Sequence, residues 1–257
     1  IKVRVYLEGA LMNNSNATAD GRPLMRDNLR VSPFTATRYM PDTDPYRTAT
    51  TYVNVVSKFT KVAPGDRTEF LTIPNPSTVF AVTGQNAIVD WVFIELRSKS
   101  SNTTVVATRS GLLQRDGDVV DLDGINGLRF PGIAIDSYYV VVRHHRHLGA
   151  MSKFAQSPLQ LTTLVNFTTS ALQTFDFGST HANPVDYTGL AQKSGVKLGY
   201  MALWAGDFDA NGKVKNDNPG DDLNLLTYYV LYYPNNGNIN ANYDFAFGYL
   251  PGDFDMN

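Results

Sequence analysis

The chain has 257 residues, a formal net charge of −2, no cysteine, and a composition that is 43% hydrophobic and 18% charged. Such a chain is long enough to bury a core, and its composition excludes the disordered and collagen-like classes. The near-neutral charge argues against nucleic acid as a partner. The lack of cysteine excludes disulfides and thiolate metal sites. The sequence has no apolar run long enough to predict a membrane span.

The N-terminal part predicts one strand followed by a long loop. The chain opens on "IKVRVYLEG", a strand pattern without an initiator Met, which indicates an interior piece of a longer polypeptide. Residues 10–45 are polar and lack periodicity, so they predict a long loop or an arm that wraps the domain.

The middle of the chain predicts β structure. Residues 87–98 are apolar on both faces, which is typical of a central strand, and residues 102–117 follow as the second arm of a hairpin. "SYYVVVRHHRHLG" at 137–149 predicts another inner strand. Short strands separated by Gly, Asn, Asp and Pro favour an all-β, sandwich-like domain with long loops. We place this domain at residues 1–195 and a smaller segment at 196–257.

Two polar groups in this domain have structural interpretations. On a strand, "RHHRH" would place Arg143, His145 and His147 on one face, and we interpret these histidines as hydrogen-bonding side chains at a strand end, not as a metal or catalytic site. Asp90 lies on an apolar strand face and is expected to be buried and hydrogen-bonded. The acids between Asp116 and Asp123 surround a glycine turn, and we expect them to serve that turn.

The strongest chemical signal is "GDFDANGKVKNDNPGDD" near the C-terminus. Alternating oxygen side chains, a glycine for the sharp turn and a following backbone carbonyl make up the first half of an EF-hand-type calcium loop. The twelfth position holds Asn218, so the closing acid comes late, and a short amphipathic helix follows. The alternative is an Asx-rich turn without metal. The predicted calcium ligands are Asp207, Asp209, Asn211, Lys213 through its carbonyl, Asp217 as an alternative, and Asp221 or Asp222 as the closing acid.

The same phrase returns as "GDFDMN" at residues 252–257. Asp253, Asp255 and Asn257 occupy the three leading ligand positions, but the sequence ends before the glycine and the closing acid. Paired calcium loops are typical of dockerin-like modules. We therefore interpret residues 196–257 as a dockerin-like calcium-binding segment whose second repeat is truncated.

Several phrases together resemble a known family: "FAVTGQNAIVDWVFIELR", "LLQRDGDVVDLDG", "YYVVVRHHRHLGAM" and "GYMALWAGDFDANGKVK". They are similar to a C-terminal β-rich module of large secreted and cell-surface proteins of the Bacteroidota, which are often exported by type IX secretion. The resemblance implies an extracellular or cell-surface location. It does not imply an activity.

These observations favour a non-enzymatic structural or adhesive module of a surface fibre, appendage or large adhesin, stabilised by calcium and associating with itself or with other surface proteins. The alternative is an accessory domain of a secreted hydrolase that binds polysaccharide or docks to a partner. A third hypothesis, an enzyme, would depend on the histidine strand or on the acids between Asp116 and Asp123.

Overall fold

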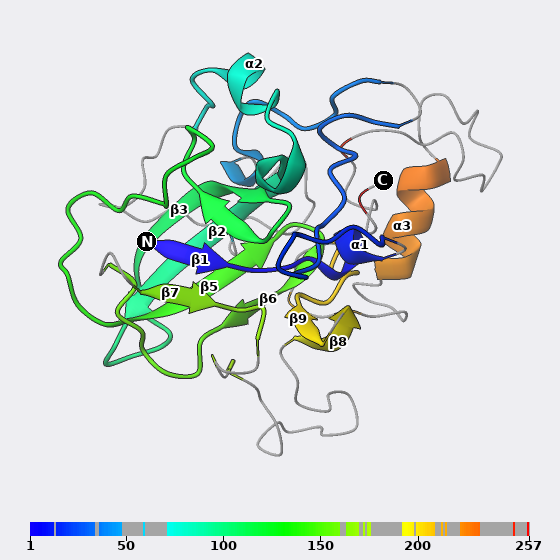
Figure 1. Ribbon diagram of the computed structural model, residues 1–257. Coiled ribbons are helices and arrows are strands. Elements are labelled where there is room, and N and C mark those ends of the chain that lie inside the picture. The colour runs from blue at the N-terminus through cyan, green and yellow to red at the C-terminus, as the bar shows by residue number, and fades with distance from the viewer. Residues whose placement is uncertain are drawn as a thin grey trace.

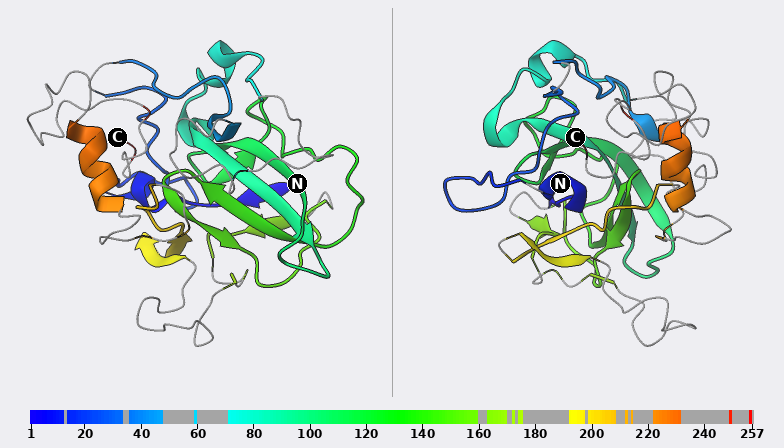
Figure 2. Two further views of the ribbon diagram at one scale, coloured as in Figure 1. Left: turned by 180° about the vertical axis from the view of Figure 1, so that it is seen from behind. Right: turned by 90° about the vertical axis from the view of Figure 1, so that its right-hand side faces the viewer.

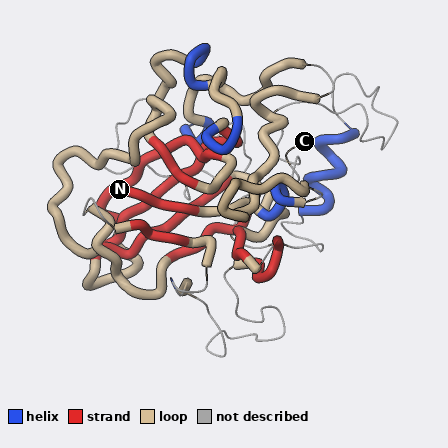
Figure 3. The backbone as a smooth tube through the Cα atoms, viewed as in Figure 1, coloured by secondary structure: helices blue, strands red, loops and turns tan. Residues whose placement is uncertain are grey.

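The computed structural model describes residues 1–12, 14–33, 36–47, 59, 71–159, 163–169, 172, 174–175, 192–197, 199–208, 212, 214, 222–231, 249 and 256, with the backbone alone at 193–197 and 229–231. These residues form a mostly β structure, as the sequence predicts (Figures 1 and 3). The strands are β1 (Lys2–Arg4), β2 (Ile88–Ser98), β3 (Val105–Gln114), β4 (Asp118–Val120), β5 (Tyr138–His144), β6 (His147–Met151), β7 (Leu164–Asn166), β8 (Lys193–Lys197) and β9 (Tyr200–Ala202).

Seven of these strands form one mixed sheet in the order β6-β5-β2-β3-β4-β1-β7, and β8 pairs with β9 in a separate two-stranded sheet. All neighbours in the large sheet are antiparallel except β1 and β7, which run parallel. The sheet curls into a half-barrel (Figure 2). The seven described strands of the large sheet form one curved layer and not a clear pair of facing sheets. The prediction of a mostly β chain is therefore confirmed, and the sandwich-like arrangement stays a prediction.

The two central strand predictions are confirmed. Strand β2 is buried on both faces from Ile88 to Leu96 and pairs with β3 in an antiparallel hairpin. Strand β5 lies between β2 and β6, as expected of an inner strand. Because apolar side chains cover both faces of β2, burial fixes its place at the middle of the sheet.

The helices are few and short: α1 (Glu8–Leu11), α2 (Pro76–Val79), α3 (Asp222–Leu231), and the 3-10 helices η1 (Pro45–Arg47) and η2 (Gly84–Asn86). None of the helices in the described ranges is long and apolar enough to cross a membrane. The predicted arm is a loop that sends Met25, Leu29 and Met40 into the main core, and all three are nearly fully buried. Wrapping of the sheet by this arm therefore adds apolar side chains to the core.

A glycine in β3 permits close packing behind the sheet. Gly111 pairs with Val92, and a Cβ atom added to Gly111 would lie 2.6 Å from a methyl group of Leu128 and 2.9 Å from the carbonyl oxygen of Val120. The backbone atom cannot move aside as easily as the end of a side chain. Only glycine therefore fits here without a shift of the packed chain.

Replacing Gly111 by alanine is expected to lower the free energy of unfolding by about 1–3 kcal/mol, because overpacking displaces neighbouring groups. Gly84→Ala is the matched control: Gly84 has a positive φ of +74° but open space around its Cβ position. Its cost should be about 1 kcal/mol and come from the backbone alone. Urea denaturation measures the free energy of unfolding of both variants. Equal stability of Gly111→Ala and the unchanged protein would contradict the crowding.

The segment at 203–206 joins the N-terminal chain to the edge of the sheet. The Leu203 amide donates to the Tyr6 carbonyl at 2.8 Å, and the Glu8 amide donates to the Leu203 carbonyl at 3.1 Å. On the other side, the Leu148 amide in β6 donates to the Trp204 carbonyl at 2.8 Å. These bonds satisfy backbone groups at the β6 edge and place α1 beside the turn between β5 and β6.

Candidate functional site

The turn between β5 and β6 gathers the histidines that the sequence lists as "RHHRH". Strand β5 ends at His144, His145 and Arg146 form a two-residue turn, and β6 begins at His147, which pairs with His144. The alternation predicted for an uninterrupted strand is therefore wrong beyond His144, because the chain reverses there. All four side chains are buried, with exposed fractions of at most 1%.

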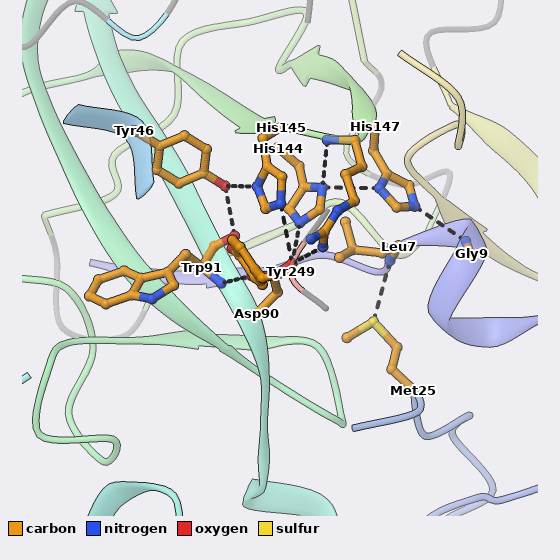
Figure 4. Close-up of polar contacts among 11 residues, drawn as sticks. Leu7, Gly9, Met25, Tyr46, Asp90, Trp91, His144, His145, His147 and Tyr249 are labelled. Carbon is orange, nitrogen blue, oxygen red and sulfur yellow. Dashed lines mark hydrogen bonds and ion pairs between the residues drawn. The ribbon is translucent and has the colours of Figure 1, made fainter. Parts of the chain in front are cut away.

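Asp90 of β2 provides the negative charge opposite this turn (Figure 4). Its Oδ2 accepts hydrogen bonds from Arg146 Nη1 at 2.9 Å and from His144 Nε2 at 3.1 Å. Its Oδ1 accepts from the Trp91 amide at 2.7 Å and from the Tyr249 hydroxyl. The Asp90 and Arg146 side chains are both 0% exposed, so their ion pair is fully buried. The expectation that Asp90 is buried and hydrogen-bonded is confirmed.

The directions of the hydrogen bonds fix the tautomers of two histidines. The Gly9 amide donates to His147 Nε2 at 3.2 Å, so the ring proton of neutral His147 lies on Nδ1. That proton points at His144 Nδ1, 3.0 Å away, which also accepts from the Arg146 amide at 3.2 Å. His144 must then carry its proton on Nε2 and donate it to Asp90. A single ordered chain of donors runs from α1 to the carboxylate.

The third histidine is held by a tyrosine from η1. The Tyr46 hydroxyl has one proton, which it donates to the Trp91 carbonyl at 2.7 Å. Its oxygen can therefore only accept from His145 Nδ1, 3.3 Å away. The rings of His144 and His145 lie 4.3 Å apart between centroids. The two rings are tilted by 31° to each other, and the Tyr46 ring contacts His145 at 5.6 Å between centroids.

Burial keeps all three imidazoles neutral. Desolvation is the main cause that lowers the pKa of His144, while the Asp90 carboxylate acts in the opposite direction. Burial, and then the positive charge of Arg146, lower the pKa of His145 well below its usual range. Burial, and then His144, do the same for His147. The cluster therefore contains one carboxylate, one guanidinium and three uncharged rings, with no net charge.

A metal ion is the obvious alternative occupant. Among the residues that the structure describes, Asp90, His144 and His145 bring one ligand atom each within 4.8 Å of one another. However, His144 Nε2 donates a proton to Asp90, and a metal ligand needs a lone pair at that atom. Arg146 also occupies the same carboxylate oxygen, and a divalent cation would add unbalanced buried charge. The geometry favours a structural ion-pair network over a metal centre.

The predicted calcium loop is described only at its two ends and at its sixth and eighth positions, Gly212 and Val214. The Asp207 carboxylate accepts from the Gly212 amide at 3.0 Å, and Gly212 has a φ of +82°. Asp222, the first residue of α3, accepts from the Phe208 amide at 2.8 Å. Both residues are buried, with 2% of their surface exposed. The predicted ligands Asp209, Asn211, Lys213, Asp217 and Asp221, and the repeat residues Asp253, Asp255 and Asn257, lie outside the described residues.

These contacts bring the first predicted ligand, Asp207, and one of the two candidate closing acids, Asp222, to one short stretch of backbone. A calcium loop needs its first carboxylate on the inside of a glycine turn and its last on the following helix. Asp207 and Asp222 have these places, and the following helix α3 is present as predicted. The binding of calcium by this loop stays a prediction.

Three of the acids between Asp116 and Asp123 accept from nearby backbone amides, as expected of turns, whereas Asp118 pairs with Arg4 of β1 at 2.6 Å. Asp121 accepts from Arg109 at 2.8 Å and from Arg129 at 2.9 Å. Burial acts to raise the pKa of Asp121, but these hydrogen bonds hold it below its usual value. Asp123 accepts from the amides of residues 125 and 126, both at 2.9 Å. The carboxylates are bound by arginines and backbone amides, which is the pattern of a structural turn.

Sequence reasoning missed Arg146, Tyr46 and Tyr249 as partners of the histidines. One signal was available: a carboxylate on an apolar strand face requires a buried cation or several donors. This signal could not identify the residues that supply the donors, because Tyr46 and Tyr249 lie far from Asp90 in the sequence.

Comparison of the chain with protein-family models, curated proteins and solved structures gives no significant match.

Proposed function

We propose that this chain is a non-enzymatic structural or adhesive module of an extracellular fibre, appendage or large adhesin, braced by calcium. The observation that carries the proposal is the sealing of the cluster around Asp90. Its histidines and its ion pair are 0–1% exposed, whereas general acid-base catalysis needs a group within reach of a substrate. A buried network of balanced charge fits a part that holds a fold together.

The calcium part of the proposal is supported by the described ends of the loop. The Asp207 and Asp222 carboxylates are buried and both are held by backbone amides of the same turn. Calcium that binds only the folded chain would stabilise it by mass action. In a chain without cysteine, bound calcium would take the place that disulfides have in many secreted domains.

Thermal unfolding in calcium and in chelator tests this. At calcium about 100-fold above its dissociation constant, the free energy of unfolding should rise by about 2.7 kcal/mol. Asp207→Asn should abolish this increment. The control is Asp123→Asn, an exposed acid of a turn that keeps its acceptor oxygen, and its increment should be unchanged. A melting temperature that does not respond to calcium would remove the bracing role.

The finer architecture in this proposal is a sandwich-like domain at residues 1–195 followed by a dockerin-like segment at 196–257. Its support is a curved β-sheet whose core receives the long N-terminal arm, together with the helix α3 after the late closing acid. A crystal structure with calcium bound would test both parts.

The alternative is an accessory domain of a secreted hydrolase. It is favoured by exposed aromatic side chains, since Phe154 is 57% and Tyr228 is 53% exposed and aromatic faces suit sugar stacking. Electron microscopy and glycan binding separate the two functions. Regular filaments or ordered self-association support the surface module, and glycan binding by a monomer supports the accessory domain.

A further inference from the structure

The cluster at the β5–β6 turn also contacts a residue from near the C-terminus. The Tyr249 hydroxyl donates to Asp90 Oδ1, across 159 positions of sequence. The guanidinium carbon of Arg146 lies 4.4 Å from the centroid of the Tyr249 ring, and the His145 ring lies 5.1 Å from it. Figure 4 shows the phenol directly against Asp90 and the turn. One side chain thus contacts the anion, the cation and one neutral ring of the cluster.

The chemistry of the cluster fits a phenol better than other side chains. Asp90 offers a carboxylate oxygen to a donor, and Arg146 presents its guanidinium to an aromatic face. Phenylalanine would supply only the face, and serine only the donor. Because the ion pair and the neutral histidines leave no net charge, a neutral ligand causes no charge imbalance, whereas an added carboxylate or ammonium group would.

Tyr249 is partly buried against the core, and a second residue near the C-terminus, Met256, is fully buried. Met256 is 1% exposed and belongs to the main core, and its φ of +59° is unusual for a residue with a side chain. Asp253 and Asp255, the leading positions of the repeated phrase, lie between Tyr249 and Met256 in the sequence. The two described residues of the segment are therefore both anchored in the β domain.

We propose that the Asp90–Arg146 cluster is a docking site for the C-terminal segment of this chain and that it recognises the phenol of Tyr249. The docking anchors the chain at Tyr249 by a contact that needs no calcium. It goes beyond the proposed function, since it concerns an interaction within the chain and would hold for an enzyme accessory domain as well.

The test uses the full chain with Tyr249→Phe and Tyr249→Leu. Chymotrypsin is added under native conditions without calcium, and cleavage after Tyr243 and Phe245, which both variants keep, is followed by mass spectrometry. Loss of a hydrogen bond to a buried charge should speed this cleavage about tenfold or more in Tyr249→Phe. Tyr249→Leu also loses the aromatic face on Arg146 and should be cleaved faster still.

Tyr228→Leu is the matched control, because Tyr228 lies on α3 and is 53% exposed. Its cleavage rate should equal that of the unchanged chain. The docking proposal is wrong if chymotrypsin cleaves Tyr249→Leu no faster than Tyr228→Leu. Calcium dependence is a separate readout, so loss of the docking and loss of the calcium site can be told apart.

A second measurement does not depend on proteolysis. The Nε2 proton of His144 is buried and donates to the same carboxylate as Tyr249, so it should give a slowly exchanging signal in nitrogen-15 NMR. Tyr249→Phe should shift this signal, because the carboxylate loses one donor, and Tyr228→Phe should leave it in place. An unchanged signal in Tyr249→Phe would overturn the contact even in a fully folded protein.

Discussion

Replacing Asp90 by asparagine is expected to lower the free energy of unfolding by about 3–5 kcal/mol, because the buried guanidinium of Arg146 loses the carboxylate that pairs with it. Asparagine has nearly the same shape, so packing around β2 is retained and the loss is mainly electrostatic. This cost is a large share of the roughly 5–15 kcal/mol that stabilises an ordinary domain. Urea denaturation followed by circular dichroism measures it.

Glu95→Gln on the same strand is the matched control. Glu95 is 3% exposed, but its partners Arg97 and Arg143 keep 17% and 24% of their side-chain surfaces exposed. Solvent can stabilise those guanidiniums, so this change should cost clearly less than Asp90→Asn. If Glu95→Gln and Asp90→Asn lower the free energy of unfolding equally, burial of Arg146 is not the reason for the loss in Asp90→Asn.

A double variant separates the charge from the shape. Asp90→Asn combined with Arg146→Met removes both charges, and a buried ion pair can often be replaced by neutral groups at little cost. The double variant should therefore be more stable than Asp90→Asn alone. An additive loss would contradict the coupling between the two residues.

Acidification below about pH 6.5 is expected to destabilise the protein steeply. The three buried histidines are neutral in the folded chain, and burial lowers the pKa of each below its ordinary value of 6.5. Between the folded and the unfolded pKa the unfolded chain binds more protons, so stability falls as the pH falls. Each histidine lowers the free energy of unfolding by up to about 1.4 kcal/mol per pH unit, and the three together lower it by up to about 4 kcal/mol per pH unit. Stability is full above about pH 7.5.

The charged and titratable groups around these rings are Asp90 from β2, Arg146 from the turn, and Tyr46 and Tyr249 from other segments. Desolvation is the largest cause of the lowered pKa of each histidine, Arg146 also lowers the pKa of all three, and Asp90 raises the pKa of His144 only. The loss of stability therefore belongs to the window from about pH 6.5 downward, above the range in which ordinary carboxylates titrate.

His147→Gln tests the origin of this slope. The glutamine oxygen can accept from the Gly9 amide, as His147 Nε2 does, but it cannot take up a proton. Equilibrium unfolding between pH 5 and pH 7.5 should show a slope that is smaller by about one third. His181→Gln changes the fourth histidine of the chain and measures what arises outside the cluster. A slope that His147→Gln leaves unchanged would rule out His147 as a source.

Local patterns predicted the parts of this protein that depend on neighbours in the sequence. Apolar side chains on both faces of β2 indicated a central strand, and the turn residues after it indicated the hairpin with β3. The pattern at Asp207 and the late acid at Asp222 indicated a loop followed by a helix, and α3 begins at Asp222. Burial and backbone geometry at these places are set within a few residues.

The cluster at the β5–β6 turn could be predicted only in part. The sequence places a carboxylate on a buried strand, and this requires a partner. Its alternation suggested a continuing strand through "RHHRH", whereas the chain turns at His145 and Arg146. A two-residue turn without glycine or asparagine gives little local signal.

The sequence by itself determined the β class, the inner strands and the buried acid, and it predicted a calcium loop from the spacing of the repeated phrase, because each follows from local periodicity and side-chain chemistry. Only the tertiary structure decided that seven of the described strands form one curved sheet, that Arg146 neutralises Asp90, and that Tyr249 contacts both. Contacts between residues this far apart depend on how the whole chain packs. No pattern within a single segment contains that information.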